Sequence, residues 1–599
     1  MHPALHLDAL NRLVPSIRRY ATLACKEGAS VKTVKRVRDL LVERSDLPTS
    51  QTNAFLPVFF HHLDPRLIPP VEALEARDSL ASDAISRALF SLNGLAYLFD
   101  LPLDVGPFLW PSLWSWIRFL MSYWDYLPKP PANLSAVGVN FITTLGLFQD
   151  HEETWKLISN TPGFRNVMAQ IWKLLPTVGK SHREAVFRVF SDLIAELDVR
   201  EPANLDEFIA GAGGSPDDLA KVIIQYMHLL TEGISTVMPD SRAVGISCLI
   251  TFIQEADDYP GDDDAWLREE FSPLCVRILL NNGLEALLAT IHALMKTPDA
   301  QTGTAIVPCM SLATRFIISP FAFRSLVHGL QAGLLRIILN SRLRYIIVAG
   351  IPMGLVFHDV VVALEAALSD IDNLTSTVAF RKSPLFQDWK TFIKLARHYI
   401  AVLDLEEFRE PERVCNNLTC GITDKKSKFR RCSGYRCRSS YYCSSECQKT
   451  DWKTGGHRSA CQSYGTLLLR ESFSNMALSN TEREFLRALI HHHYATNIDF
   501  ICAQQIGFIA SNPNDVFLTY FDHRSSPLKI ESEGRMQLHV IRIVRGAKYR
   551  HFIIPHHTAD SELFDEMGKI SVDNIYNANG DPTEAFALIT DAALEAVHS

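Results

Sequence analysis

Apolar positions recur every three to four residues along most of the chain, from its start to about residue 404. This spacing gathers apolar side chains on one face of a helix. We find no convincing segment in this part that alternates apolar and polar residues in the manner of a strand. The pattern therefore predicts that the chain is helical almost without interruption up to residue 404.

Glycines precede several of these predicted helices. Gly163 and Gly283 are each followed by apolar residues at the same offsets, Gly329 opens a looser copy, and Gly94 opens a truncated one. The intervals of 120 residues from Gly163 to Gly283 and 46 from there to Gly329 fit units of about 40 to 47 residues, the repeat length of armadillo and HEAT arrays. We expect an armadillo/HEAT-like helical solenoid over residues 1–404, with an irregular helical domain as the alternative.

The last helix of this array is predicted to begin at Ser383 and Pro384, because a capping residue followed by proline is typical of a helix start. Its apolar stripe continues to Ile400. The charged segment 405–411 then indicates a short connector to the next domain.

The pattern of apolar and polar residues changes after residue 465. A helix is predicted from about Thr481 to Ile509, and a second begins at Asp581 and Pro582. Between them lie segments rich in β-branched and aromatic residues, which predict strands: 516–523, 536–546 and 548–557. Residues 465–599 are therefore expected to form a small α+β domain.

Length and charge limit the class of protein. A chain of 599 residues exceeds the size of a single hydrophobic core, and 47% apolar with 21% charged residues is typical of globular proteins. A net charge of -8 gives no reason to expect nucleic acid or an anionic membrane as the main partner. We read no signal peptide and no apolar run of about 20 residues, so we expect an intracellular protein of the cytoplasm, the nucleus or both.

Cysteine is concentrated in one short segment, since seven of the twelve cysteines fall within 47 residues. Without a secretory signal, such a cluster favours metal binding over disulfides. The potential ligands, spaced as four pairs, are Cys415, Cys420, Cys432, Cys437, Cys443, Cys447, His457 and Cys461. Eight such ligands fill two tetrahedral sites, and Zn²⁺ is the metal that suits thiolate and imidazole.

Basic residues accompany the ligands. Residues 412–461 carry eleven Lys or Arg against four acids, a balance of +7. Seven thiolates and two Zn²⁺ change this by -7 and +4 and leave about +4. Because the basic residues are interleaved with ligands, and no recognition helix or aromatic stacking platform accompanies them, we consider nucleic acid an unlikely partner.

The order of the ligands, with the motifs FRRCSG, YYCSSECQ, DW and GGHRSAC, resembles a MYND-type zinc finger over residues 412–462. A long helical part before the finger and a short part after it also resemble fungal MYND-type domain-containing proteins. The resemblance implies a cross-brace, in which one zinc binds the first and third ligand pairs and the other binds the second and fourth. Both ions are then structural.

MYND fingers generally bind short proline-rich peptides. The resemblance implies that Ser433, Gln448 and Trp452 are the peptide contacts, although Trp452 is also interpretable as a core residue of the finger. One departure from the family is the insertion of Tyr435 and Arg436 between the third and fourth ligands. We expect this insertion beside Ser433 to change the shape of the peptide groove or to block it.

An enzymatic function has less support in the sequence. MYND fingers also occur in lysine methyltransferases and prolyl hydroxylases, but the methyltransferase motifs are missing. His62 and Asp64 have the hydroxylase spacing only in a helical context. His491 to His493 have no obvious carboxylate partner, and on a helix three consecutive histidines point to different faces. We therefore expect a zinc-binding interaction scaffold and not an enzyme; the alternatives are an unrecognised catalytic site in the C-terminal domain and a nucleic-acid-associated regulator.

A final motif lies near the start of the chain. Pro65, Leu67 and Pro69 fit the Pro-x-Leu-x-Pro pattern that MYND fingers of corepressor-binding proteins recognise. The segment is a candidate ligand for the protein's own finger, in the same chain or in a second copy. It also makes sense as a loop between two helices, where prolines end one helix and start the next.

Overall fold

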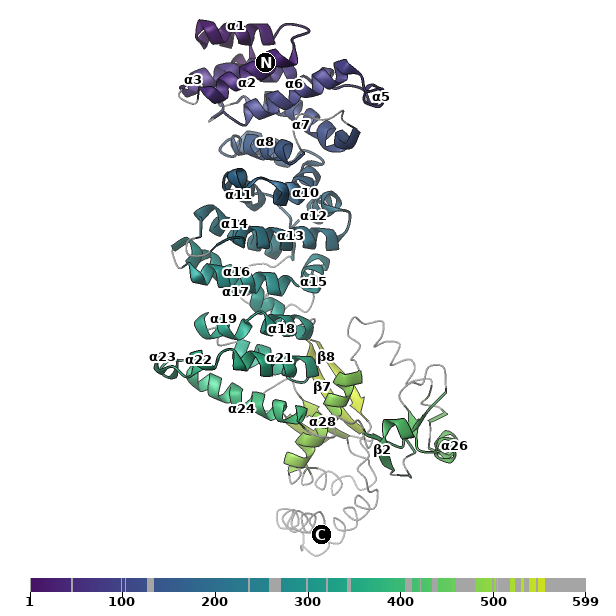
Figure 1. Cartoon of the computed structure of the whole chain (residues 1–599). Coiled ribbons are helices and arrows are strands. Elements are labelled where there is room, and N and C mark those ends of the chain that lie inside the picture. Colours follow the sequence, from purple (N-terminus) through teal and green to yellow (C-terminus); the bar gives the residue numbers. More distant parts are fainter. Residues whose placement is uncertain are drawn as a thin grey trace, which may run out of the picture. The chain divides into compact units, whose positions relative to one another are not determined.

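Helices dominate the computed structural model of this chain, which confirms the prediction of a mostly α protein (Figure 1). The structure describes residues 2–44, 47–98, 100–102, 104–126, 134–234, 238–257, 271–297, 300–318, 322–341, 346–404, 412–417, 419–420, 422–433, 440–455, 457–458, 461, 480–497, 500–501, 504, 518–522, 529–532, 538–545 and 548–554. The predicted connector 405–411 and the predicted helix at Asp581 lie outside them.

The chain divides into two compact units. One comprises Met1–Trp266 with Glu270–Leu312, and the other includes Ala313–Ser599, so the boundary falls inside the helix α17 (Ala300–Ile318). The predicted helical domain 1–404 therefore extends over a division that its periodicity does not reveal.

The first unit contains a series of helices. Its 3₁₀ helices are η1 Pro3–Leu5, η2 Leu7–Arg12, η3 Asn53–Phe55, η4 Pro65–Leu67, η5 Trp124–Tyr126 and η6 Leu175–Thr177. Its α-helices before α17 are α1 Pro15–Ala24, α2 Val31–Glu43, α3 Thr49–Thr52, α4 Leu56–His62, α5 Val71–Glu75, α6 Ser79–Leu95, α7 Gly106–Tyr123, α8 Leu134–Gly146, α9 Glu152–Ser159, α10 Phe164–Leu174, α11 Lys180–Ala195, α12 Pro202–Ala212, α13 Pro216–Thr231, α14 Asp240–Ala256, α15 Pro273–Leu280 and α16 Gly283–Lys296.

Neighbouring helices of the first unit pack on one another in chain order (Figure 1). Helix α2 packs on α6, α6 on α8, α8 on α11 and α11 on α14; beside this row, α10 packs on α12, and α13 packs on α15 and α16. Large apolar side chains such as Trp116, Trp172 and Phe190 are fully buried between the helices. The apolar stripes read from the sequence therefore face neighbouring helices.

Two of the four glycine assignments are confirmed. Gly163 adopts φ +82 immediately before α10, a conformation that L side chains rarely adopt, and Gly283 is the first residue of α16. The other two are wrong. Gly94 lies inside α6, where a Cβ atom would collide with the ring of Phe59, so this glycine serves close packing.

Gly329 likewise lies within α18 (Ala322–Gln331), so it does not start a helix. The break comes at Gly333, which adopts φ +88 before α19 (Leu334–Ser341). The glycine that precedes a helix in this part of the chain is therefore four residues further along the sequence than predicted.

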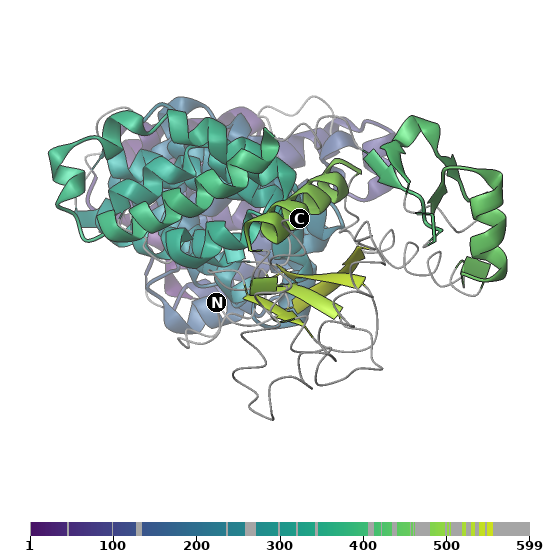
Figure 2. The ribbon, with the colours of Figure 1, turned by 90° about the horizontal axis from the view of Figure 1, so that it is seen from below.

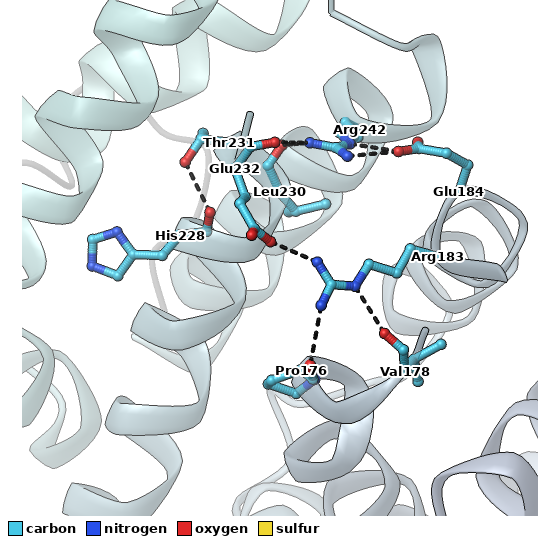
Figure 3. A network of polar contacts seen from close by, with 9 residues as sticks. All are labelled: Pro176, Val178, Arg183, Glu184, His228, Leu230, Thr231, Glu232 and Arg242. Atoms are coloured by element: carbon cyan, nitrogen blue, oxygen red, sulfur yellow. Dashed lines mark hydrogen bonds and ion pairs between the residues drawn. The ribbon is translucent and has the colours of Figure 1, made fainter. Parts of the chain in front are cut away.

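An arginine near the start of α11 holds the end of the preceding helix (Figure 3). Arg183 donates from Nε to the carbonyl of Val178 (2.9 Å) and from Nη2 to that of Pro176 (3.2 Å). Its third group, Nη1, pairs with Glu232 at 2.6 Å. Carbonyls at a helix end lack intrahelical partners, and a cation is favourable beside them, so Arg183 caps η6.

The same kind of contact recurs at α14 (Figure 3). Arg242 donates from Nη1 to the carbonyls of Glu232 (2.7 Å) and Leu230 (3.3 Å), at the end of α13, and from Nε to Glu184 (2.8 Å). Arg183 and Arg242 have side chains only 15% and 14% exposed. The charged network therefore fixes α11 and α14 to the ends of the helices that precede them.

A third arginine repeats the first contact at the same sequence offsets. Arg18 donates from Nε to Leu13, five residues back, and from Nη2 to Asn11, seven residues back, as Arg183 does to Val178 and Pro176. Both arginines follow a 3₁₀ helix and lie in the first turn of an α-helix. The local structure around Arg18 thus reappears around Arg183.

The second unit continues with helices and ends in a sheet. Besides α18 and α19, its elements outside the finger are the π-helix η8 Ile346–Gly350, α20 Ile351–Gly354, α21 His358–Ser369, α22 Asp372–Thr375, α23 Val378–Arg381, α24 Phe386–Leu403, α28 Asn480–Thr496, β5 Leu518–Asp522, β6 Lys529–Ser532, β7 Leu538–Arg545 and β8 Lys548–Ile554. Helix α24 begins two residues after Pro384.

The four strands lie side by side in the order β6-β5-β7-β8 (Figure 2). β5 pairs antiparallel with β6 and parallel with β7, and β7 pairs antiparallel with β8. In register, Tyr520 lies opposite Glu531 on one side and Val540 on the other. β5, β7 and β8 fall in the three segments named from the sequence, whereas the short β6 was not anticipated.

No single described helix is long and apolar enough to cross a membrane, although the bent pair α15 and α16, with 76° between them, passes that test by length and composition. Leu274, Ile278, Leu284 and Leu287 of this pair are buried in the first unit.

Candidate metal centre

Two short hairpins and one helix position the cysteines of residues 412–461 (Figure 2). β1 (Glu412–Val414) pairs antiparallel with β2 (Thr423–Lys425), and β3 (Arg430–Arg431) pairs antiparallel with β4 (Tyr441–Tyr442). A 3₁₀ turn, η9 (Lys426–Lys428), separates the hairpins, and α26 (Ser445–Lys453) follows them. With so little regular structure, this segment depends on its side chains for cohesion.

Each hairpin places a cysteine directly after its first strand. Cys415 follows β1 and donates its backbone N–H to Ile422 (2.9 Å), and Cys432 follows β3 and donates to Ser440 (2.9 Å). The third ligand pair along the chain, Cys443 and Cys447, lies at the start of α26. There the Ser444 side chain accepts the N–H of Cys447 and caps the helix. The fold thus brings together cysteines that are distant in sequence, such as Cys415 and Cys443.

Four cysteines form the first ligand group: Cys415, Cys420, Cys443 and Cys447, whose sulfurs all lie within 4.8 Å of one another. The Sγ of Cys443 is 3.4 Å from that of Cys420 and 3.5 Å from that of Cys447. Tetrahedral zinc with Zn–S bonds of about 2.3 Å requires sulfurs about 3.8 Å apart. The donor set and its spacing therefore fit a zinc ion.

Three further ligands form the second group: Cys432, His457 and Cys461, all buried. His457 Nε2 lies 3.3 Å from Cys432 Sγ, and its Nδ1 lies 3.5 Å from the hydroxyl of Ser440. This leaves Nε2 facing the sulfurs as the metal-binding nitrogen. Cys437, the fourth predicted member, lies outside the described residues, as do Tyr435 and Arg436.

The thiols of the first group have unequal acidity without metal. Burial raises the pKa of Cys415 to about 12 and also raises that of Cys443, whereas a hydrogen bond from Ser444 lowers the pKa of Cys447 to about 7. Zinc binds thiolate, so filling this group releases protons from thiols that burial otherwise keeps neutral. The site therefore favours a cation strongly once the thiolates form.

A buried hydrogen bond behind the ligands joins β4 to α26. The Tyr442 hydroxyl donates to Asp451 Oδ2 at 2.7 Å, and both side chains are buried. The Tyr442 ring also packs edge-on against His457, with 5.8 Å between centroids. This hydrogen bond was not predicted from the sequence. The signal that could have indicated it is a tyrosine and an acid that flank the ligands in a segment poor in apolar residues.

Of the three predicted peptide contacts, Trp452 and Ser433 lie beside residues of the second ligand group, whereas Gln448 follows Cys447 of the first. Gln448 and Trp452 are one helical turn apart on α26, and the Trp452 ring lies 5.7 Å from that of His457. Ser433 is exposed and follows Cys432, the sulfur neighbour of His457. Trp452 is 40% exposed, so much of its surface is open to solvent.

The histidines considered for other chemistry have different settings. His62 is buried with Nε2 2.9 Å from the carbonyl of Ala24, and Asp64 caps η4, so the pair serves the local fold. His492 and His493 both meet His398 of α24, a partner that the sequence did not suggest. Among the described residues, only the two finger groups have a metal-binding arrangement.

The comparison with known families agrees with this geometry. The family model of the MYND finger matches residues 413–461, which contain all eight predicted ligands. No curated protein and no solved structure matches the chain.

Proposed function

We propose that this chain, whose residues 413–461 form a MYND-type zinc finger, is a protein-interaction scaffold with two structural zinc ions. The observation that carries the proposal is the pair of ligand groups, one of four cysteines and one of two cysteines with His457. Their members alternate along the chain in the manner of a cross-brace. We propose Cys437, which lies outside the described residues, as the fourth ligand of the second group.

The zinc ions act by holding the finger together and not by catalysis. A structural site has four protein ligands, whereas a catalytic zinc keeps one position for water or substrate. With eight protein ligands for two ions, no position is left for a reacting group. We therefore propose a binding role without enzymatic activity.

The surface around Trp452 is the proposed peptide site. The exposed indole of Trp452 offers an apolar face to proline, and the half-buried Gln448 offers an amide to the peptide backbone. Ser433 follows Cys432, a member of the second ligand group. Because His457 packs against Trp452, the zinc site fixes the orientation of the indole. The ligand class is a short segment that contains proline.

A proline-rich peptide with the pattern Pro-x-Leu-x-Pro, titrated into the zinc-loaded protein by calorimetry, tests this site. Aromatic residues at the centre of an interface contribute about 2 kcal/mol or more, so Trp452→Ala is expected to weaken binding about 30-fold. The matched control is Lys453→Ala, an exposed neighbour on α26, with binding unchanged. Equal binding by the Trp452→Ala variant rules out this surface.

The helical part is proposed to be an armadillo/HEAT-like solenoid that presents a long surface to partners. Two features support this: successive packing of α2, α6, α8, α11 and α14, and the recurrence of the Arg18 contact at Arg183. The C-terminal α28 and the sheet β6-β5-β7-β8 are proposed to belong to one small α+β domain.

The segment around Leu67 is proposed as a ligand for the finger in this chain or in a second copy. Leu67 is 38% exposed, but Pro69 is buried and Pro65–Leu67 form η4, capped by Asp64. Binding therefore requires this turn to open. A peptide of residues 61–73 is expected to compete with the external peptide, and Leu67→Ala in it to abolish the competition; no competition at about millimolar peptide refutes the self-contact.

A further inference from the structure

Three histidines from two helices lie in contact within the second unit. His492 Nε2 of α28 is 3.4 Å from His398 Nδ1 of α24, and His398 Nε2 is 3.3 Å from His493 Nδ1 of α28. The ring of His398 lies 4.5 Å from that of His492 and 5.0 Å from that of His493. His398 therefore uses both nitrogens to bridge two adjacent residues of α28.

These histidines, which we call the histidine bridge (His398, His492 and His493), lie on the surface by which α28 is docked. Phe485, Leu489 and His493 recur at helical spacing on the buried side of α28. Helix α28 packs on α24 and on α21. His493 is 4% exposed, so the bridge lies within the packed contact between the helices and not on the solvent-exposed surface.

The number of protons decides whether the bridge holds. A neutral imidazole has one donor and one acceptor nitrogen, so three neutral rings satisfy both contacts. One added proton is also accommodated, because a charged His398 donates to both neighbours. A second proton leaves two N–H groups facing each other in at least one contact, with two like charges close together. We infer that the histidine bridge is a proton-operated latch that releases α28 from α24 and α21 in mild acid.

Among the described residues, no carboxylate contributes to the pKa of His398 or of His492. Tyr399 of α24 faces His493, with 5.8 Å between rings, and burial raises the pKa of its hydroxyl, which keeps it neutral. From α21, His358 lies against Phe485 and pairs with Asp359. The acid Glu482 is buried near the start of α28, about three turns from His493.

Asp388 of α24 is half-buried but lies about three turns before His398, and other charged groups of these packed elements are exposed. Glu365 of α21, and Lys394 and Arg397 of α24, are exposed, while the sequences of η8 and α20, which also pack on α24, contain no titratable residue. Protons added at His398 and His492 therefore meet no carboxylate among the described residues that would offset their charge.

The direction of the pH effect follows from burial. Burial lowers the pKa of His492 and of His398, and His492 lowers that of His398 further. An unperturbed histidine has a pKa of about 6.5. Because the folded pKa lies below this value, docking of α28 keeps its full stability above about pH 6.5 and loses it as the pH falls through the lowered pKa.

Release of α28 changes what the chain presents. The helix follows the finger and precedes β5 in sequence, so freeing it also frees the connection between the two. It exposes Phe485, Leu486 and Leu489, which are buried in the docked state. The latch thus couples proton concentration to the exposure of an apolar helix face beside the zinc finger in the chain.

Hydrogen exchange of the full zinc-loaded chain tests the latch. After correction for intrinsic exchange, protection of α28 amides is expected to fall about tenfold or more from pH 7.5 to 5.5, while α10 in the first unit stays protected. The double variant His398→Asn/His492→Gln keeps polar atoms but removes two titrating rings. Its α28 protection is expected to change less than about threefold over the same range.

Matched variants and metal controls separate the latch from other causes. His358→Gln alters another histidine of the same interface and should retain the wild-type fall; His492→Gln alone, at a half-buried position, should reduce it. A chelator at pH 7.5 should leave α28 protected. The latch is refuted if the protection of α28 in the wild type does not depend on pH, or if it falls with pH as much in the double variant as in the wild type. It is also refuted if zinc removal alone causes the loss of protection, or if a third zinc ion bound through His398 protects α28.

Discussion

The hydrogen bond between Tyr442 and Asp451 should control how tightly the finger holds zinc. Tyr442→Phe removes a hydroxyl that lies 2.7 Å from a carboxylate oxygen in a buried site. A hydrogen bond to a charged group contributes about 1.5–3 kcal/mol, and the remaining carboxylate has little access to water. Because zinc binding and folding of such a segment are coupled, this free energy should appear as weaker zinc retention.

At 1.4 kcal/mol per factor of ten, this loss corresponds to an apparent zinc affinity lower by about 10- to 150-fold. Competition with a chromophoric chelator at pH 7.5 measures it. Asp451→Asn is the matched comparison, because the amide oxygen still accepts from Tyr442. The bond is then between neutral groups and contributes about 0.5–1.5 kcal/mol, so the loss should be smaller. Zinc retention in Tyr442→Phe within about twofold of the wild type refutes the reasoning.

Three further outcomes follow from described contacts. Arg183→Ala should lower the free energy of unfolding of the first unit by about 2–4 kcal/mol in urea denaturation, because two carbonyls and Glu232 lose their donor; an effect no larger than that of the exposed Arg188→Ala contradicts the helix-capping role. Gly455→Ala should weaken zinc retention in the chelator assay, since its Cβ would collide with the Asp451 carboxylate; unchanged retention contradicts this. Zinc retention should fall from pH 7.5 to 5.5, because thiols such as Cys415, whose pKa burial raises, must lose protons to bind; retention that rises with acidity contradicts it.

Helix positions were predictable where a glycine has a backbone role. Gly163, at φ +82, marks a real helix start because the turn before α10 requires a conformation that glycine adopts freely. Gly94 misled the prediction because its role is tertiary: it makes room for Phe59 of another helix. Sequence periodicity records which residues are apolar, but it does not distinguish a glycine that bends the chain from one that admits a neighbour.

The finger was recognisable because its ligands are close in sequence and chemically distinctive. The spacing alone gave four pairs and two sites; the division into Cys415 with Cys443 and Cys432 with His457 rested on the family resemblance. The structure brings these residues together, through hairpins whose strands are two or three residues long. The MYND resemblance itself is confirmed by the family match over residues 413–461.

The histidine bridge shows what local patterns miss. His492 and His493 are visible as part of a histidine run, but His398 is more than 90 residues away in sequence. Only the packing of α28 on α24 joins them. Consecutive histidines on one helix face different directions, but a single ring from a second helix, His398, contacts two neighbouring positions.

The zinc content of the purified full-length protein tests the central claim most directly. Mass-spectrometric metal analysis with X-ray absorption at the zinc edge is expected to give two zinc ions per chain and an average of about 3.5 sulfur ligands per ion, since seven cysteines and one histidine share two tetrahedra. One zinc per chain, stoichiometric iron, or an average close to two sulfurs per ion contradicts the two-site account.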